Sequence, residues 1–123
     1  MKGIETLFVG TGAIFAVIGM VWGIQMSATQ DHSLSPAHGH LNLIGFVIMT
    51  VYGLYYAVTP AARTGLAKVH YLLTLAAVVV LIPGIVMALT QSGEVLAKLG
   101  SVLTLLSMLT FVYTVFRKGV GAA

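Results

Sequence analysis

The sequence predicts an all-α integral membrane protein, a bundle of four transmembrane helices. Hydrophobic residues make up 59% of the 123 residues and charged residues only 7%, whereas an average soluble domain is about 25% charged. Four apolar stretches are each long enough for a helix of about 20 residues, the length needed to cross a hydrocarbon layer about 30 Å thick. None of them alternates strictly between apolar and polar residues, as the strands of a membrane barrel do.

The predicted helices cover residues 4–26, 37–58, 66–89 and 95–116, joined by short polar segments at 27–36, 59–65 and 90–94. Because almost nothing is left over, residues 1–123 are expected to form a single transmembrane domain. The first stretch has the apolar character of a signal peptide, but no small-x-small cleavage site follows it. We therefore expect it to remain as the first helix.

The first two helices carry packing and capping signals. Gly19 and Gly23 in the first helix are spaced so that another helix can approach closely. Pro36 suits the first turn of the second helix, where its missing N–H costs nothing, and Ser35 then occupies the N-cap position.

The third and fourth helices carry signals of a different kind. Pro83 followed by Gly84 predicts a kink in the third helix. Ser101, Thr104 and Ser107 form a row along the fourth helix, with one residue per turn. Such a row is typical of hydrogen bonding between helices in a bilayer.

The basic residues predict the orientation. Lys98 is the single basic residue on one side of a four-helix topology, where it accompanies Asp31 and Glu94. Since Lys and Arg accumulate on the cytoplasmic side, both termini should be cytoplasmic, in a bacterial inner membrane. The segments 27–36 and 90–94 should then face the periplasm or the exterior. The cytoplasmic set comprises Lys2, Arg63, Lys68, Arg117 and Lys118.

Composition also limits the chemistry. The chain contains no cysteine, which excludes disulfides, iron–sulfur clusters and thiolate metal sites. A net charge of +3 from scattered residues does not predict a nucleic-acid surface. Among the residues that remain, the four histidines are the best candidates for metal ligands.

Three of these histidines, His32, His38 and His40, fall within nine residues. His38 and His40 are two residues apart, about 200° around a regular helix, so one metal cannot be bound by both from that helix. Each heads a different face of the second helix. The His38 face continues through Asn42, Gly45, Met49, Tyr52 and Tyr56, and the His40 face through Ile44, Val47, Val51 and Leu54.

The first of these faces is polar, small and aromatic, whereas the second is aliphatic. We expect His38 to face the protein interior or a cofactor, because an ionisable residue inside a membrane span is a functional candidate by default. We expect the His40 face to meet lipid or an apolar neighbour. His70 lies near the cytoplasmic end of the third helix, on the order of 25–30 Å from His38 at 1.5 Å per residue. It therefore cannot share that site, and we expect it at the membrane interface.

Residues 36–46, followed by Gly53, Tyr55, Tyr56 and Pro60, resemble the second transmembrane helix of haem-copper oxidase subunit I and of nitric oxide reductase large subunits. They are also similar to small four-span bacterial membrane proteins described as cytochrome-c-oxidase-like. Residues 66–71 resemble the start of the next helix in these families. In the large enzymes the second helix supplies a histidine ligand to the low-spin haem, and His38 matches that position best.

The resemblance implies a haem b protein, either an electron carrier or a small oxidoreductase, with His38 as axial ligand. The helices that bear the catalytic haem and the copper ligands have no counterpart, so oxygen reduction is not implied. Met26, Met87 or a residue of another copy could supply the second axial ligand, and a homo-oligomer is expected because four helices scarcely enclose a macrocycle. The residues expected around the iron are His40, Asn42, Gly45, Trp22 and Tyr52.

Two other functions stay open. One is a copper site at the outer face, built from His32, His40 and a methionine such as Met26, because imidazole and thioether suit copper. The other is a cofactor-free structural or partner subunit with an interfacial histidine cluster. Nothing in the sequence decides whether the protein is an enzyme, and a haem-dependent Lewis-acid isomerase is as compatible with it as redox chemistry.

Overall fold

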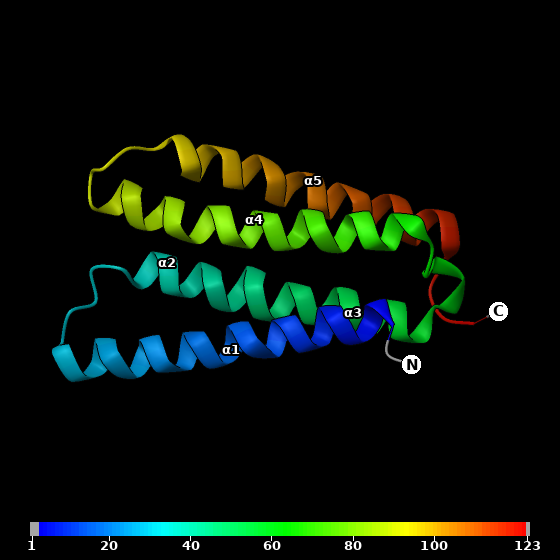
Figure 1. Cartoon of the computed structure of the whole chain (residues 1–123), viewed down its shortest axis with the longest axis horizontal. Helices are drawn as coiled ribbons and strands as arrows, with labels where there is room; N and C mark the ends of the chain where they lie inside the picture. Colours follow the sequence, from blue (N-terminus) through cyan, green and yellow to red (C-terminus); the bar gives the residue numbers. More distant parts are fainter. Residues whose placement is uncertain (1–2, 123) are drawn as a thin grey trace.

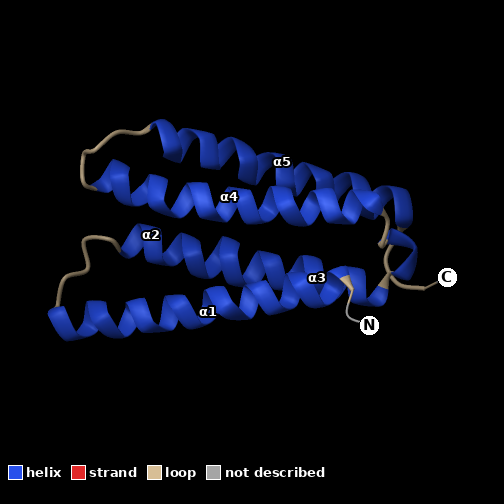
Figure 2. Cartoon of the chain, in the orientation of Figure 1, coloured by secondary structure: helices blue, strands red, loops and turns tan. Residues whose placement is uncertain are grey.

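The computed structural model describes residues 3–122 and shows four long rods arranged as two antiparallel hairpins (Figure 1). The first hairpin pairs α1 (Ile4–Thr29) with a composite rod made of α2 (Ser35–His40), η1 (Leu41–Ile48) and α3 (Met49–Val58). The short 3-10 helix η2 (Pro60–Ala62) leads to the second hairpin, α4 (Gly65–Leu89) and α5 (Val95–Lys118). The described residues contain helices and loops and no strand, as Figure 2 shows.

All four rods are long and apolar enough to cross a membrane. Large apolar side chains on the outer helices point away from the protein, among them Ile24 of α1, which is 70% exposed, and Leu105 of α5, which is 58% exposed. Apolar surface on this scale is rare on a soluble monomer and is the normal outer surface of a protein in lipid. The predicted set of four apolar helices is thus confirmed.

The helices run slightly longer than the sequence predicts. Residues 27–29 extend α1 by most of a turn, and the Thr29 hydroxyl donates to the Gln25 carbonyl at 2.9 Å. Gln30 then ends the helix with a φ of 57°, the left-handed geometry in which many helices stop. The second rod begins at Ser35, with Pro36 in its first turn as expected. The N-cap is Leu34 rather than the predicted Ser35, because Ser35 is already part of the helix.

The composite rod is not a regular α-helix. Residues 41–48 form a π-helix, in which each amide bonds the carbonyl five residues earlier, and the sequence analysis did not predict it. Such segments are rare and often lie at functional sites. This one follows directly after His40. The two predicted faces nevertheless hold, since Gly45, Met49, Tyr52 and Tyr56 are buried while Val47, Val51 and Leu54 are exposed.

Two glycines allow the backbones of α4 and α5 to touch. A methyl group added at Gly84 would lie 2.5 Å from the Ala97 nitrogen, and one added at Gly100 would lie 2.5 Å from Cα of Leu81. Between them and the basic end of the bundle, Thr74 and Ser107 share a hydrogen bond of 2.7 Å. The hydrogen bonding predicted for the serine and threonine row of the fourth helix is therefore confirmed at Ser107, while α4 continues through Pro83 to Leu89.

The remaining members of that row bond within their own helix. The Ser101 hydroxyl donates to the Ala97 carbonyl and the Thr104 hydroxyl to the Gly100 carbonyl, each at 2.8 Å. Ser101 is exposed and Thr104 half-buried. Both line a groove between the hairpins.

The connection between the hairpins is tied down by Arg63. Its Nε donates to the Tyr56 carbonyl and its Nη2 to the Ala57 carbonyl, both at 2.7 Å, and Nε lies 3.0 Å from a Glu5 carboxylate oxygen. Basic side chains near the last carbonyls of a helix satisfy acceptors that the helix itself leaves open. Arg63 therefore closes the end of α3 and joins it to the start of α1.

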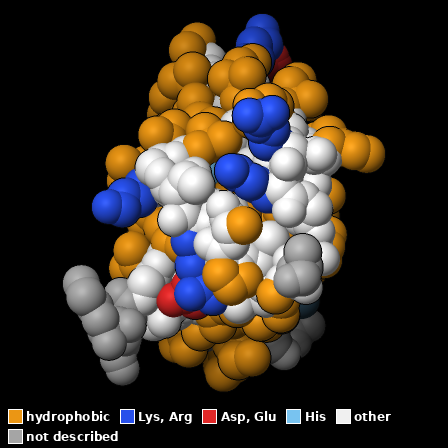
Figure 3. Space-filling model, turned by 90° about the vertical axis from the view of Figure 1, so that its right-hand side faces the viewer, with side chains coloured by type: hydrophobic (Ala, Val, Ile, Leu, Met, Phe, Trp, Pro, Cys, Tyr) orange, Lys and Arg blue, Asp and Glu red, His pale blue; other side chains and the backbone are white. Residues whose placement is uncertain are grey.

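Basic side chains gather at this end of the molecule, within a rim of apolar ones (Figure 3). Arg63 and Lys68 lie at the start of the second hairpin and Arg117 and Lys118 in the last turn of α5, whereas Lys98 lies in the first turn of α5 at the opposite end. Lys2, which the sequence analysis placed with the first group, is outside the described residues. The two ends of the bundle thus differ in charge as the sequence predicts.

Candidate functional site

His38 lies in the seam between α1 and α2. Its Nε2 is 2.9 Å from the carbonyl oxygen of Gly19. The Trp22 ring approaches the imidazole edge-on, with centroids 5.8 Å apart and planes at 81°. Pro36 and Ser35 start α2 one turn earlier, and that start sets the position of His38 against α1. The imidazole is therefore oriented by two groups of α1, one polar and one aromatic.

The hydrogen bond to Gly19 decides which nitrogen carries the proton. A carbonyl oxygen only accepts, so Nε2 of His38 donates and Nδ1 keeps the lone pair of the neutral ring. Metal-ligating histidines almost always donate their other ring N–H to a carbonyl, a carboxylate or water. His38 thus has the hydrogen-bonding arrangement of a metal ligand, and equally that of a histidine that fastens two helices together.

Gly19 and Gly23 were predicted to permit close helix approach, and residues of the second rod of the same chain pack against both. A methyl group at Gly23 would lie 3.2 Å from Nε2 of His38, and one at Gly19 would collide with the Asn42 amide. Beside this seam lies an open groove of about 380 Å³ on the outer surface, bordered by Ala16, Gly19, Met20, Gly23, His38, Asn42 and Phe46. Asn42 and His38 thus pack directly against the two glycines of α1.

His40 faces a different part of the molecule. Its Nδ1 is 2.7 Å from the Pro36 carbonyl of its own helix, so Nδ1 donates and Nε2 keeps the lone pair. The side chain is exposed and borders a groove of about 370 Å³ between the hairpins. The other residues of that groove are Ile44, Leu81, Ile85, Ala97, Ser101 and Thr104. The predicted separation of the two histidines onto different faces is therefore seen, and the neighbour of the His40 face is mainly aliphatic.

Other predicted site residues lie apart from His38. His32 is exposed in the loop before α2, where Asp31 accepts hydrogen bonds from the Ser33 amide and hydroxyl that lower the pKa of its carboxyl. Gly45 does not leave open space, because a methyl group there would lie 3.2 Å from Phe15 of α1. Tyr52 belongs to an aromatic cluster farther along the bundle, described next.

The three residues proposed for copper, His32, His40 and Met26, differ in burial. Met26 is buried in α1, whereas His32 and His40 are both exposed. Among residues 3–122, no group of three or more His, Cys, Asp or Glu side chains is arranged to hold a metal ion. Met87, the other thioether considered as an axial ligand, is half-buried on α4.

A second histidine site, which was not predicted from the sequence, lies in the half of the bundle near the basic end. His70 of α4 is fully buried rather than interfacial. Its Nδ1 is 2.8 Å from the Tyr56 hydroxyl. Its ring centroid lies 4.3 Å from that of Tyr52 and 5.3 Å from that of Phe8, and it stacks on Phe111 at 6.1 Å. All four rods contribute to this cluster.

One polar atom of this cluster has no partner. Nε2 of His70 is buried and forms no hydrogen bond within the described structure. Nearby, the Tyr52 hydroxyl approaches the Met108 sulfur at 3.7 Å, and the Thr74 hydroxyl donates to the His70 carbonyl at 2.7 Å. A signal was present in the sequence: Phe8, Tyr52, Tyr56 and Phe111 all lie in the half of their helices nearest the basic end, at the depth of His70.

Of the six residues expected around a haem, the structure brings His38, Trp22 and Asn42 together at one seam. It places His40 on the opposite groove and Tyr52 in the His70 cluster, and it fills the space beside Gly45. No protein family, no curated protein and no solved structure matches this chain.

Proposed function

We propose that the chain is a multi-pass protein of a bacterial inner membrane with both termini in the cytoplasm. Support comes from the four apolar helices and from the basic end formed by Arg63, Lys68, Arg117 and Lys118, because Lys and Arg near helix ends accumulate on the cytoplasmic side. In this orientation the His38 seam lies at the periplasmic side of the membrane, and the His70 cluster lies nearer the cytoplasm.

Within that membrane, the proposed function is haem b binding, with His38 as the axial ligand, for electron transfer or a small oxidoreductase-like reaction. The observation that carries the proposal is the 2.9 Å hydrogen bond from Nε2 of His38 to the Gly19 carbonyl. It holds the ring and its tautomer so that a single nitrogen, Nδ1, has the lone pair that iron needs. The available donor set therefore fits an iron with one histidine ligand from this chain.

The surrounding residues fit a flat apolar group. The groove beside His38 is bordered by small residues, Ala16, Gly19 and Gly23, and its larger apolar side chains are Met20 and Phe46. Asn42 and Trp22 border the same imidazole and would tune its basicity and orientation. When bound, haem supplies one-electron redox chemistry or, with an open axial position, a binding place for a small molecule.

The groove beside His38 is shallow and faces lipid, so one copy of the chain encloses little of a macrocycle. We therefore propose a homo-oligomer in which a second copy covers the groove and supplies the other axial ligand or leaves that position open. Symmetric homo-oligomers are the usual form of assembly. A detergent-corrected mass of one chain at full haem loading would contradict this arrangement.

Optical spectroscopy combined with metal analysis of the purified full-length protein tests the haem proposal. A Soret band with iron is the expected result, and His38→Ala should remove it at equal protein expression. The matched controls are His40→Ala, which changes the groove on the other face, and His70→Ala, which changes the opposite half of the bundle; both should leave the band unchanged. Copper without a Soret band would favour a copper protein. If neither iron nor copper is found, the remaining interpretation is a cofactor-free subunit in which His38 fastens α2 to α1.

A further inference from the structure

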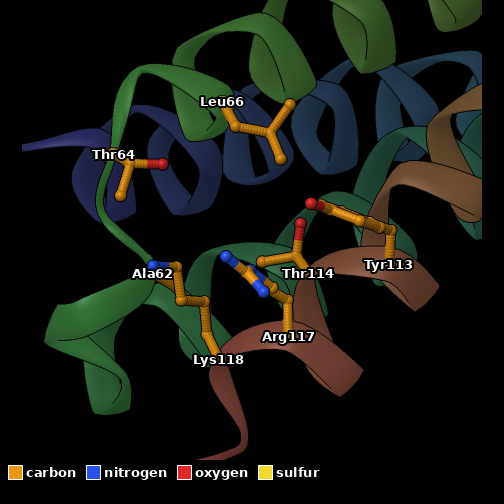
Figure 4. A pocket seen from close by; sticks show the side chains of 7 residues that line it. All are labelled: Ala62, Thr64, Leu66, Tyr113, Thr114, Arg117 and Lys118. Carbon is orange, nitrogen blue, oxygen red and sulfur yellow. The ribbon is translucent and has the colours of Figure 1, made fainter.

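A cavity of about 190 Å³ opens at the basic end, where the start of α4 meets the last turns of α5 (Figure 4). Its wall contains two cationic side chains, Arg117 and Lys118, and the hydroxyl-bearing residues Thr64, Tyr113 and Thr114. In Figure 4 the Tyr113 hydroxyl and the Arg117 guanidinium point toward the same space. The cavity thus presents cations and hydrogen-bond donors together.

Within the described part of the chain, no carboxylate balances the positive charge of this wall. None of the residues that line the cavity is acidic, and within residues 3–122 the one ion pair joins Arg63 to Glu5. An arginine can bind two oxygens of a phosphate in a bidentate manner and a lysine adds a point charge, so Arg117 and Lys118 together suit a phosphate group. The ligand chemistry that fits the cavity is therefore a phosphate ester.

An apolar groove continues from the same cavity along α4 and α5. Leu66 and Tyr113 border both spaces. The groove has a volume of about 400 Å³ and runs past Leu73, Leu106 and Leu109. From Leu66 to Leu73 it covers seven residues of α4, about 10 Å at 1.5 Å per residue. A free phosphate has no contact to make there, whereas an amphiphile would use both spaces at once.

We propose that this composite site binds an anionic phospholipid, with the headgroup phosphate between Arg117 and Lys118 and one acyl chain along the groove. The proposal rests on membrane insertion with the basic end at a lipid surface and is independent of haem. Basic pockets between transmembrane helices on the cytoplasmic side are places where anionic headgroups bind. Tyr113 lies at the junction, where an aromatic residue with a hydroxyl suits the boundary between headgroup and hydrocarbon.

The test is native mass spectrometry of the delipidated full-length protein in neutral detergent, titrated with palmitoyl-oleoyl phosphatidylglycerol or with phosphatidylcholine of the same chains. Phosphatidylglycerol is expected to form the more abundant complex. Arg117→Gln combined with Lys118→Gln should weaken its binding by about thirty-fold, because each basic residue at an anionic lipid surface contributes about a five-fold factor. Lys98→Gln, at the opposite end of the bundle, is the matched control and should leave binding unchanged.

Two further binding measurements distinguish a lipid ligand from a soluble anion. Leu109→Trp fills the groove at a residue that is 53% exposed, so the variant should fold and bind less phosphatidylglycerol. Inorganic phosphate at the lipid's concentration should not displace the lipid. The proposal is overturned if both lipids bind equally to the wild-type protein, if inorganic phosphate displaces phosphatidylglycerol, or if Leu109→Trp binds it as well as wild type does.

Discussion

The hydroxyl of Tyr56 lies 2.8 Å from Nδ1 of His70 and joins α3 to α4 inside the aromatic cluster. Both side chains are fully buried, so neither group can replace its partner with water. When a buried polar group loses its hydrogen-bond partner, the free-energy cost of removing it from water is no longer offset. Each member of the pair is therefore tolerated in the core because the other is present.

Tyr56→Phe should lower the free energy of unfolding by about 1–3 kcal/mol, since it leaves the His70 ring without a partner. His70→Phe should also lower the free energy of unfolding, because it leaves the Tyr56 hydroxyl without a hydrogen-bond partner and adds volume to a packed site. The double variant should lose less stability than the sum of the single variants, by about 0.5–3 kcal/mol. Reversible unfolding in mixed micelles, followed by circular dichroism, measures all four proteins.

Tyr113→Phe provides the control for this cycle, because Tyr113 is 58% exposed and its hydroxyl is not buried in the bundle. Its stability should stay within about 0.5 kcal/mol of wild type, as is usual for surface substitutions. Additive effects of Tyr56→Phe and His70→Phe would show that the two side chains do not depend on each other.

Gly84 provides a second prediction, on the packing of the second hairpin. In Gly84→Ala the new methyl group meets the backbone of α5 at 2.5 Å, and backbone cannot turn aside as a flexible side chain can. The helices must separate, and overpacking of this kind costs about 1–3 kcal/mol. Gly10→Ala is the matched control in α1, since nothing lies within 4 Å of the added methyl group. It should be neutral or stabilising by up to about 1 kcal/mol, and equal losses for both variants would contradict the close contact of α4 and α5.

Much of the fold was predictable because the relevant signals are local. Apolar length defines the four helices, and Pro36 marks the start of the second rod within two residues. The face of His38 was also predictable, since small and polar residues recur below it at helical spacing. Gly19 and Gly23 were identified as points of close approach, but not the helix that approaches, because one sequence does not say which rods become neighbours.

The rest depends on contacts between distant segments. Burial of His70 requires Phe8, Tyr52 and Phe111 from three other rods, and its position near a helix end suggested the membrane interface instead. The π-helix at residues 41–48 carries no distinctive composition, since it differs from an α-helix only in its hydrogen-bond register. Open space beside Gly45 was predicted, but Phe15 packs there. Phe15 comes from another helix, so this contact also depends on distant segments of the chain.

The orientation in the membrane gives a third prediction. The chain has no cysteine, so single cysteines at exposed positions report one site each. Ser33→Cys and Ser92→Cys, in the two loops at one end, should react with a membrane-impermeant maleimide from the periplasm. Thr64→Cys, at the basic end, should react only after the inner membrane is opened, because that end carries the Lys and Arg residues that stay in the cytoplasm. The reverse pattern of labelling would invert the topology, and with it the side on which the His38 seam lies.

The last prediction separates the geometry of the His38 seam from its proposed function, and Trp22 provides the signal. Trp22 is the single tryptophan of the chain, and its ring centroid is 5.8 Å from that of His38. Without haem, His38→Ala should expose more of the indole and shift its emission to longer wavelength. His40→Ala should leave the emission unchanged, because that ring is held by Pro36 and borders the groove on the other face. These two outcomes test the seam alone.

Titration of the same three proteins with haem then tests the function. Haem absorbs where tryptophan emits, so haem bound at the seam should quench Trp22 in the wild-type protein and in His40→Ala. His38→Ala should need about ten-fold more haem or more for the same quenching, since changes even beside a metal ligand lower affinity by about 10–100-fold. Equal quenching of all three proteins would place any bound haem away from His38. If the emission shift occurs without any quenching, the seam is as described and His38 serves to fasten α2 to α1.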